Sequence, residues 1–270
     1  MLFFPSAKIN LGLNVIRKRK DGYHDIETVM YPIGLCDAME FIVDRQITQH
    51  KMTYSGEKII GEHELCAGLL DRLSRDTGIP PLHVHLHKNI PPGAGLGGGS
   101  ADALFFLMKL IEYFNLPLDF DTQYQIAKET GSDCPFFLYN KPLLATGRGE
   151  VLSEIKVSLK GYNLLLVIPG IDISTQEAYA AVIPSGNENL VASNCMRPVV
   201  EWKDILVNQF EEILFPKYPL LGQLKNTLYS MGALYASVTG SGSGIYGIFK
   251  EQVKIPQELK EYRVYIEKMN

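Results

Sequence analysis

The chain has 270 residues, of which 46% are hydrophobic and 21% charged, a composition typical of a folded globular protein and not of a disordered or fibrous one. A single chain of this length buries enough surface to fold without a disulfide or a structural metal. The formal net charge is −4, which argues against a protein that coats nucleic acid.

The N-terminal segment predicts a strand. Apolar and polar residues alternate from Ala7 to Val15, which places Lys8 and Asn10 side by side on the open face of a half-buried strand. A turn over residues 18–22, which follows the basic run 17–20, leads into a second extended segment. Residues 39–60 are expected to add further strands joined by polar turns.

The rest of the chain mixes helical and strand patterns without regular βαβ alternation, which favours the α+β class. The next expected elements are a helix over 64–77, a strand over 82–87, helices over 101–114 and 121–129, and strands over 143–146 and 150–155. After residue 160 we expect a strand over 164–168, helices over 175–183, 199–214 and 218–231, and a hairpin of strands 234–238 and 245–249. We predict two domains, residues 1–157 and 158–270.

Three histidines share one face of the strand predicted over 82–87: His83, His85 and His87. Imidazoles two residues apart on a strand can converge on a metal ion, but no carboxylate is spaced to complete such a site. A solvated polar face explains the same alternation. We favour that interpretation over a metal site.

A glycine-rich loop joins this strand to the helix that follows it. Residues 93–99 hold five glycines, and Ser100 stands at the start of the predicted helix. Glycine lets backbone N–H groups approach a phosphate closely, and a helix N-terminus adds the positive end of its dipole. Ser100 is placed either to cap the helix or to hold a phosphate or its metal ion. A flexible turn is the alternative, but this glycine content before an apolar helix favours phosphate binding.

Familiar nucleotide-binding motifs do not fit the two glycine-rich loops. Gly93-x-Gly95-x-x-Gly98 has the form of a dinucleotide fingerprint, but a Pro-Pro segment separates it from its strand. The second loop, residues 239–244, precedes a strand instead of a helix. The chain also has no P-loop sequence and none of the catalytic segments of protein kinases.

Five segments, in the same order along the chain, resemble the motifs of the GHMP small-molecule kinases. They are residues 7–13, 21–25, 91–101, 131–136 and 239–244. The triple glycine of the third segment and Gly22-Tyr23-His24 in the second resemble one subfamily. Its members act on a cytidine-diphospho methylerythritol in non-mevalonate isoprenoid precursor biosynthesis.

The resemblance implies a two-domain α+β GHMP kinase fold with the active site in the cleft between the domains. It implies transfer of the γ-phosphoryl group of ATP to the 2-hydroxyl of 4-(cytidine 5'-diphospho)-2-C-methyl-D-erythritol, with Mg²⁺ as the expected cofactor. By motif position, Asp133 corresponds to the catalytic acid–base and Lys8 to its catalytic partner. Ser100 is the one candidate metal ligand. The structural alternatives are a helix N-cap for Asp133 and a solvated strand lysine for Lys8.

The same resemblance implies two sets of binding residues. Those for ATP are Pro91, Pro92, Gly93, Ala94, Gly95, Leu96, Gly97, Gly98, Gly99, Ser100 and Ala101. Those for the substrate are Asn10, Tyr23, His24, Thr175, Tyr179, Gly240 and Ser241. The aromatic members offer ring faces on which a cytosine can stack. Core packing is the alternative explanation for Tyr179, and helix capping is the alternative for Thr175.

Two other functions compete with this one. The first is another GHMP kinase, acting on homoserine, mevalonate or a sugar, against which Gly22-Tyr23-His24 argues. The second is a non-catalytic phosphate- or RNA-binding protein, which the acidic charge and the presence of both Lys8 and Asp133 disfavour. We therefore expect small-molecule partners, with no nucleic acid and no membrane, and make no prediction of the oligomeric state.

The expected location is the cytoplasm. Four scattered cysteines without paired spacing predict free thiols in a reducing compartment. No N-terminal segment resembles a signal peptide, and no apolar run is long enough to span a membrane.

Overall fold

The computed structural model describes residues 1–57 and 63–270, which form two compact units. Unit 1 comprises Met1–Ala7, Gly34–Pro92 and Gly97–Lys141, and unit 2 comprises Lys8–Ile33, Gly93–Leu96 and Pro142–Asn270. The chain crosses between the units several times, so neither is one continuous segment. The predicted boundary between residues 157 and 158 does not coincide with any of these crossings and stays a prediction. The last three residues of the strand region predicted over 39–60 lie outside the described residues.

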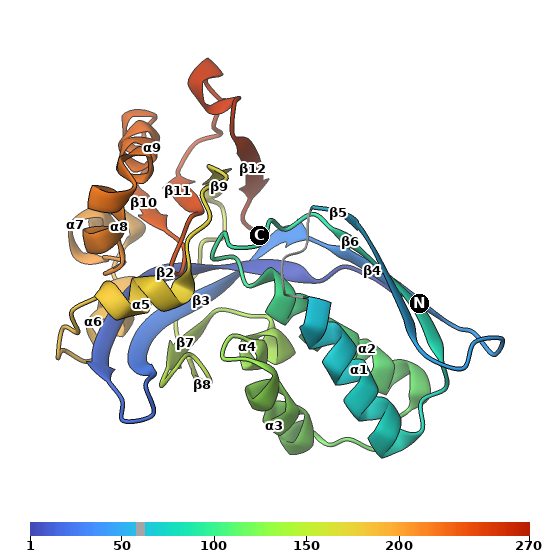
Figure 1. The fold of residues 1–270 in the computed structure, drawn as a ribbon. Helices are drawn as coiled ribbons and strands as arrows, with labels where there is room; N and C mark the ends of the chain where they lie inside the picture. The colour runs from blue at the N-terminus through green and yellow to red at the C-terminus, as the bar shows by residue number, and fades with distance from the viewer. Residues whose placement is uncertain (58–62) are drawn as a thin grey trace. The chain divides into compact units, whose positions relative to one another are not determined.

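Unit 1 is built on a sheet of four strands among its described residues (Figure 1). Their order is β1 (Leu2–Phe3), β4 (Ala38–Val43), β6 (Leu82–Lys88) and β5 (Lys51–Gly56), with β5 parallel to β6 and the other pairs antiparallel. The alternation predicted for β6 is confirmed, since its leucines and valine are buried while the histidines point to the other face.

Four helices belong to the described part of unit 1: α1 (His63–Thr77), α2 (Gly98–Phe114), α3 (Phe120–Thr130) and α4 (Cys134–Tyr139). Helix α2 packs against the other three, and its Phe106 ring packs against Phe3 of β1 and Phe41 of β4. It begins three residues before the predicted start, so the end of the glycine loop forms its first turn. Helix α4 is an element that the sequence patterns did not predict.

Unit 2 contains two further four-stranded sheets within the described residues. The first, in the order β2-β3-β7-β8, consists of β2 (Ser6–Lys18), β3 (His24–Cys36), β7 (Leu143–Thr146) and β8 (Val151–Glu154). The second, in the order β10-β11-β9-β12, consists of β9 (Asn163–Ile168), β10 (Tyr235–Val238), β11 (Ile245–Phe249) and β12 (Arg263–Lys268). All pairs in the second sheet are antiparallel, and the predicted hairpin is its β10–β11 pair.

The described part of unit 2 contains five α-helices: α5 (Thr175–Ala181), α6 (Leu190–Cys195), α7 (Trp202–Ile205), α8 (Glu211–Lys217) and α9 (Pro219–Ser230). Of these, α5, α8 and α9 contribute to the core on one face of the second sheet (Figure 1). Leucines of α8 and α9 share one core with β9, β10 and β11. No helix in the described part of the chain is both long and apolar enough to span a membrane.

The single helix predicted over 199–214 is wrong. A 3₁₀ turn at Val199–Glu201, then α7 and α8, occupy that region, with a break over residues 206–210. In the break, Leu13 of β2 donates its N–H to Val207 O and accepts the N–H of Gln209. The backbone therefore pairs with a strand instead of continuing the helix.

Candidate active site

Lys8 and Asn10 lie on β2 as predicted, but the predicted open face is wrong, because both side chains are buried. Lys8 is 3% exposed and Asn10 is 2% exposed. Two loops cover them: Lys8 N–H donates to Leu96 O at 3.0 Å, and Asn10 N–H donates to Thr239 Oγ1 at 3.1 Å. Lys8 is therefore not the solvated strand lysine of the alternative interpretation.

Polar contacts orient the Lys8 ammonium. Nζ donates to Asn10 Oδ1 at 2.6 Å and to Gly95 O at 3.0 Å. Asn10 Nδ2 in turn donates to Thr28 Oγ1 on β3 at 3.1 Å, and that hydroxyl donates to Gly12 O. The network holds a positive charge beside the first glycine loop, which suits contact with phosphoryl oxygens. Thr28 is a member that the sequence patterns did not indicate.

The two glycine loops pack backbone to backbone inside unit 2. Ser243 N–H donates to Gly93 O and Gly244 N–H donates to Ala94 O, each at 3.1 Å. Gly95 has φ +72°, and a Cβ there would lie 2.0 Å from Thr239 O. Only glycine fits at position 95, because both the backbone angle and the space exclude a side chain.

Two buried polar residues fix the second glycine loop from the side of α8. Asn208 Nδ2 donates to Val238 O at 2.9 Å and to Gly240 O at 2.8 Å. Glu211 Oε1 accepts the N–H of Val238 at 3.0 Å. The sequence patterns indicated neither residue, because apolar spacing assigned their segment to a continuous helix.

Predicted substrate residues meet at α5. The rings of His24 and Tyr179 stack with centroids 5.3 Å apart at 25°, and the Tyr179 ring also packs edge-on against Phe210 at 4.9 Å. The Tyr179 ring therefore packs against the core through Phe210 and also stacks on His24. Burial, with a smaller effect of Lys18, lowers the pKa of His24, so its imidazole is neutral at pH 7.

Thr175 lies at the start of α5 and contacts the second glycine loop. Its Oγ1 lies 2.9 Å from Ser241 Oγ. The capping explanation for Thr175 is wrong, because Ser174 is the N-cap and accepts the N–H of Glu177. The two predicted substrate residues Thr175 and Ser241 are thus brought together.

Tyr23 presents its ring to solvent at the start of β3. The side chain is 54% exposed, and the guanidinium of Arg148 lies 4.9 Å from the ring centroid. The basic turn before it is paired with acids: Arg19 contacts Asp21 and Asp25, and its hydrogen bonds hold the pKa of both carboxyls below the usual range. Arg148 is a neighbour that the sequence patterns did not indicate.

In unit 1 the first turn of α2 has no side-chain cap among the described residues. Gly97 is the N-cap residue with φ +70°, and within the described residues no side chain caps the helix and no acid lies in its first turn. Ser100 is the third residue of the helix, so the capping interpretation of Ser100 is wrong. Its hydroxyl hydrogen-bonds to the Cys134 thiol, whose pKa burial raises to about 12. The N–H groups at this helix start are available to an anion.

Asp133 occupies the N-cap position of α4, but its carboxylate makes no capping hydrogen bond there. The structural alternative for Asp133 therefore lacks the contact that defines it. Asp133 belongs to unit 1 and Lys8 to unit 2. Their catalytic pairing stays a prediction.

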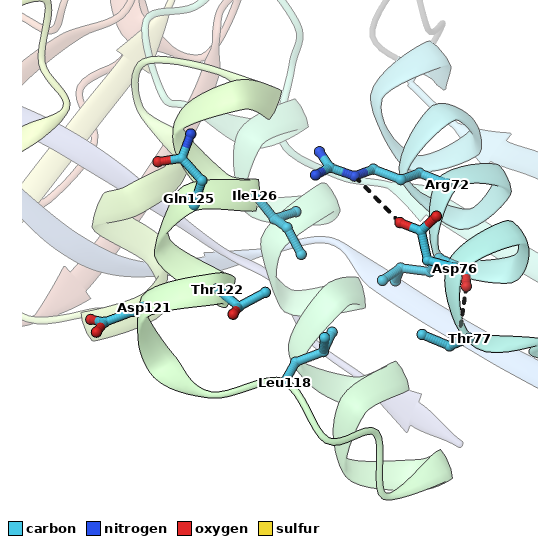
Figure 2. A pocket seen from close by; sticks show the side chains of 9 residues that line it. Arg72, Asp76, Thr77, Leu118, Asp121, Thr122, Gln125 and Ile126 are labelled. Carbon is cyan, nitrogen blue, oxygen red and sulfur yellow. Dashed lines mark hydrogen bonds and ion pairs between the residues drawn. The ribbon is translucent and has the colours of Figure 1, made fainter.

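Other candidate sites hold none of these residues. His85 engages both ring nitrogens, Nδ1 with Thr53 Oγ1 at 2.9 Å and Nε2 with Ser55 Oγ at 2.8 Å. No group of three or more metal-ligating side chains is found among the described residues, so a metal site on the histidine strand is not supported. A groove of about 360 Å³ between α1 and α3, lined by Arg72 and Asp76 among others, contains no predicted site residue (Figure 2).

Comparison with known proteins decides the family. Residues 64–141 match the model of the GHMP kinases N terminal domain, and residues 193–263 match that of the GHMP kinases C terminal. A 4-diphosphocytidyl-2-C-methyl-D-erythritol kinase from Bacteroides thetaiotaomicron is 44% identical over 263 residues, covering 95% of each chain. The chain belongs to the GHMP kinase family. The predicted family is thereby confirmed.

Further GHMP kinases agree at longer evolutionary distance. A 4-diphosphocytidyl-2-C-methyl-D-erythritol kinase from Caldanaerobacter subterraneus is 38% identical over 92% of this chain and 88% of its own. A crystal structure of 4-(cytidine 5'-diphospho)-2C-methyl-D-erythritol kinase superposes with a TM-score of 0.78 at 25% identity over 98% of both chains. Methanococcus jannaschii mevalonate kinase gives a TM-score of 0.71 at 15% identity over 100% of this chain and 98% of its own, which shows the fold alone. The mixed α and β GHMP kinase fold is confirmed.

Proposed function

We propose that this GHMP kinase transfers the γ-phosphoryl group of ATP to the 2-hydroxyl of 4-(cytidine 5'-diphospho)-2-C-methyl-D-erythritol. The observation that carries the substrate is the identity of 44–46% over nearly the whole chain with kinases named for it. The exposed Tyr23 ring supports it, since it offers an aromatic face to a cytosine, and the stacked pair of His24 and Tyr179 begins at the next residue of the chain.

ATP is assigned to the first glycine loop, residues 91–101. The uncapped start of α2 supports this, because its N–H groups and dipole favour phosphate. Mg²⁺, when bound with ATP, would neutralise phosphate charge. Ser100 is the proposed protein ligand; Mg²⁺ keeps several waters and is also held by substrate phosphates, so it needs no all-protein cage.

Asp133 and Lys8 carry the proposed chemistry. Asp133 accepts the proton of the substrate 2-hydroxyl while the oxygen of that hydroxyl bonds to the γ-phosphorus of ATP. The bond between the γ-phosphorus and the oxygen that bridges it to the β-phosphate breaks at the same time, which releases ADP. Lys8, fixed by Asn10 and Gly95, stabilises the negative charge on the transferred group. Gly240 and Ser241 are assigned to the substrate from the second loop.

The proposed location is the cytoplasm. All four cysteines are free thiols, and three of them are buried, which fits a reducing compartment.

The substrate assignment is tested by ADP production from ATP with four acceptors. We expect turnover with the cytidine-diphospho compound and none above background with mevalonate, homoserine or galactose. Folded protein that turns over one of those three and leaves the cytidine compound unphosphorylated would contradict the assignment.

The role of Asp133 is tested against a true helix cap. Asp119 is the N-cap of α3, and its carboxylate accepts the N–H of Thr122 at 2.9 Å. Asp119→Ala is expected to cost about 1 kcal/mol of unfolding free energy and to leave turnover unchanged. Asp133→Ala and Asp133→Asn are expected to lower kcat by roughly 10²–10⁴ with little change in stability. An Asp133→Ala chain that behaves like Asp119→Ala would assign Asp133 to capping.

A further inference from the structure

Unit 1 buries three charged side chains that the chemistry above does not use: Asp37, Lys88 and Asp102. Lys88 Nζ lies 2.5 Å from Asp37 Oδ2 and 2.6 Å from Asp102 Oδ2. All three side chains are at most 3% exposed. We call them the buried ion cluster. Buried ion pairs seldom add stability over apolar residues of similar volume, so stability alone does not explain this cluster.

Asp37 fixes the segment that enters the first glycine loop. Its Oδ1 accepts the N–H of Asn89 at 2.5 Å and the N–H of Ile90 at 2.7 Å. The next two residues are prolines, which have no N–H. These two bonds are therefore the last backbone donations that the chain can make before Gly93.

Asp102 fixes the helix that leaves the loop. It is the fifth residue of α2, one turn after the helix start at Gly98. The Lys88 ammonium lies beside that start as well: a Cβ on Gly98 would come within 3.3 Å of Nζ and 2.9 Å of Ile90 Cγ2. One ammonium group thus joins the end of β6 to the first turns of α2.

We propose that the buried ion cluster sets the first turn of α2 in the orientation that receives the phosphates of ATP, with Asp102 as a positioning residue. The inference rests on the assignment of ATP to this loop. Because Asp37 holds the entry and Asp102 holds the exit, the loop ends are fixed before the nucleotide arrives. Groups that are ordered in advance lose less conformational entropy on binding.

An uncharged amide at position 102 can keep the contact with Lys88. Two carboxylates share one ammonium, and Asp102 Oδ1 has no hydrogen-bond partner among the described residues. Burial raises the pKa of Asp102 well above its usual range, the Lys88 ammonium opposes that rise, and the neighbouring Asp37 carboxylate adds to it. An asparagine keeps an oxygen for Lys88 Nζ, so it should replace Asp102.

The test compares three variants of the full chain with the wild type. Asp102→Ala removes the contact to the helix while leaving Lys88 paired with Asp37. Asp102→Asn is the conservative rescue. Asp76→Ala is the matched control, because Asp76 lies in the same unit, 62% exposed, with its carboxylate 3.9 Å from Arg72 (Figure 2). Four quantities are measured: the Kd of a non-hydrolysable ATP analogue, the KM of ATP, the KM of the cytidine-diphospho substrate, and Tm.

Asp102→Ala is expected to raise both the analogue Kd and the KM of ATP at least tenfold, with the KM of the cytidine substrate within twofold of wild type. For Asp102→Asn, the analogue Kd and the KM values of ATP and of the cytidine substrate are all expected to stay within threefold of wild type. Asp76→Ala is expected to match wild type. Should the alanine chain not fold, Asp102→Ser, whose hydroxyl is too short to reach Lys88, replaces it with the same expectation.

Two results would overturn the proposal. In the first, Asp102→Ala lowers Tm while the analogue Kd keeps its wild-type value, which assigns the cluster to structure alone. In the second, Asp102→Asn weakens ATP-analogue binding as much as Asp102→Ala does. A wild-type chain that binds the analogue but leaves the cytidine substrate unphosphorylated would refute the proposed function instead, and the Kd comparison would still decide the role of Asp102.

Discussion

Residues 93–99 and residues 239–244 are both rich in glycine, and each contains glycines with positive φ. In the second loop the N–H groups of Thr239, Gly242, Ser243 and Gly244 all donate to carbonyl groups of the chain. The first loop ends in a helix start that no described side chain caps. The two loops thus share their glycine content, but they differ in whether their backbone N–H groups donate to acceptors of the chain.

This difference suits the start of α2 to binding an anion, and it suits residues 242–244 to supporting the first loop. A phosphate needs N–H groups without an acceptor, and the start of α2 supplies them. The second loop uses its N–H groups to hold Gly93 and Ala94 in place, and Asn208 and Glu211 hold it in turn. We expect substitutions in the second loop to act first on stability and those at α2 to act first on nucleotide binding.

The largest expected effect breaks the contact between the loops. Gly95→Ala places a Cβ on Thr239 O at a positive φ, and we expect it to cost roughly 3–5 kcal/mol of unfolding free energy. Gly170→Ala is the matched control, with φ +70° and nothing within 4 Å of its Cβ, and should cost about 1 kcal/mol. Urea denaturation measures both. Equal losses would mean that the loops do not depend on their close approach.

A smaller effect is expected at the hydroxyl that joins the loops. Thr239→Val removes the donor to Gly95 O and the acceptor of the Asn10 N–H, leaving buried polar groups unpaired. We expect a loss of about 1–3 kcal/mol. Thr175→Val, whose hydroxyl is exposed and contacts Ser241, should change stability by less than about 0.5 kcal/mol. A loss in Thr175→Val as large as that in Thr239→Val would contradict this ranking.

The smallest expected effect is the change in stability with pH that comes from His24, whose ring stacks on Tyr179 of α5. The pKa of His24 is lowered from 6.5 in the folded chain, so the unfolded state binds its proton first as pH falls. Stability from this group is present above pH 6.5 and is lost as pH falls through 6.5 toward the lower folded pKa. His50 contributes with the same sign, because burial lowers its pKa too.

Unfolding free energies at pH 7.5 and pH 5.5 check this sign. The wild type should lose unfolding free energy between pH 7.5 and pH 5.5. His24→Gln and His50→Gln should each lose less than the wild type, and the two differences should add in the double variant. A wild type that gains stability between those pH values would show that His24 is not destabilised as a cation.

Local sequence patterns predicted which residues share one face of a strand and where a glycine-rich loop meets a helix. The alternation in β2 placed Lys8 beside Asn10, and the glycine loop before α2 was found from composition alone. The burial of Asn10 and Lys8 was not predictable in this way, because the loops that cover them include Thr239, far along the chain. Periodicity reports the neighbours within one element and is silent about a loop from elsewhere.

The broken helix after residue 199 illustrates the same limit. Its apolar spacing fits a helix, yet residues 207 and 209 pair with Leu13 of β2. That competition places Asn208 and Glu211 where they hold the second glycine loop, so the missed break and the missed residues have one cause. The motif resemblance, by contrast, identified the family because it joined five segments that periodicity treats separately.

The claim that the start of α2 binds the phosphates of ATP and that residues 242–244 do not is tested most directly by backbone amide NMR during titration with a non-hydrolysable ATP analogue. We expect large shifts for the amides of Gly98, Gly99 and Ser100, and small ones for Gly242, Ser243 and Gly244. Large shifts in the second set with little change at the start of α2 would contradict the claim.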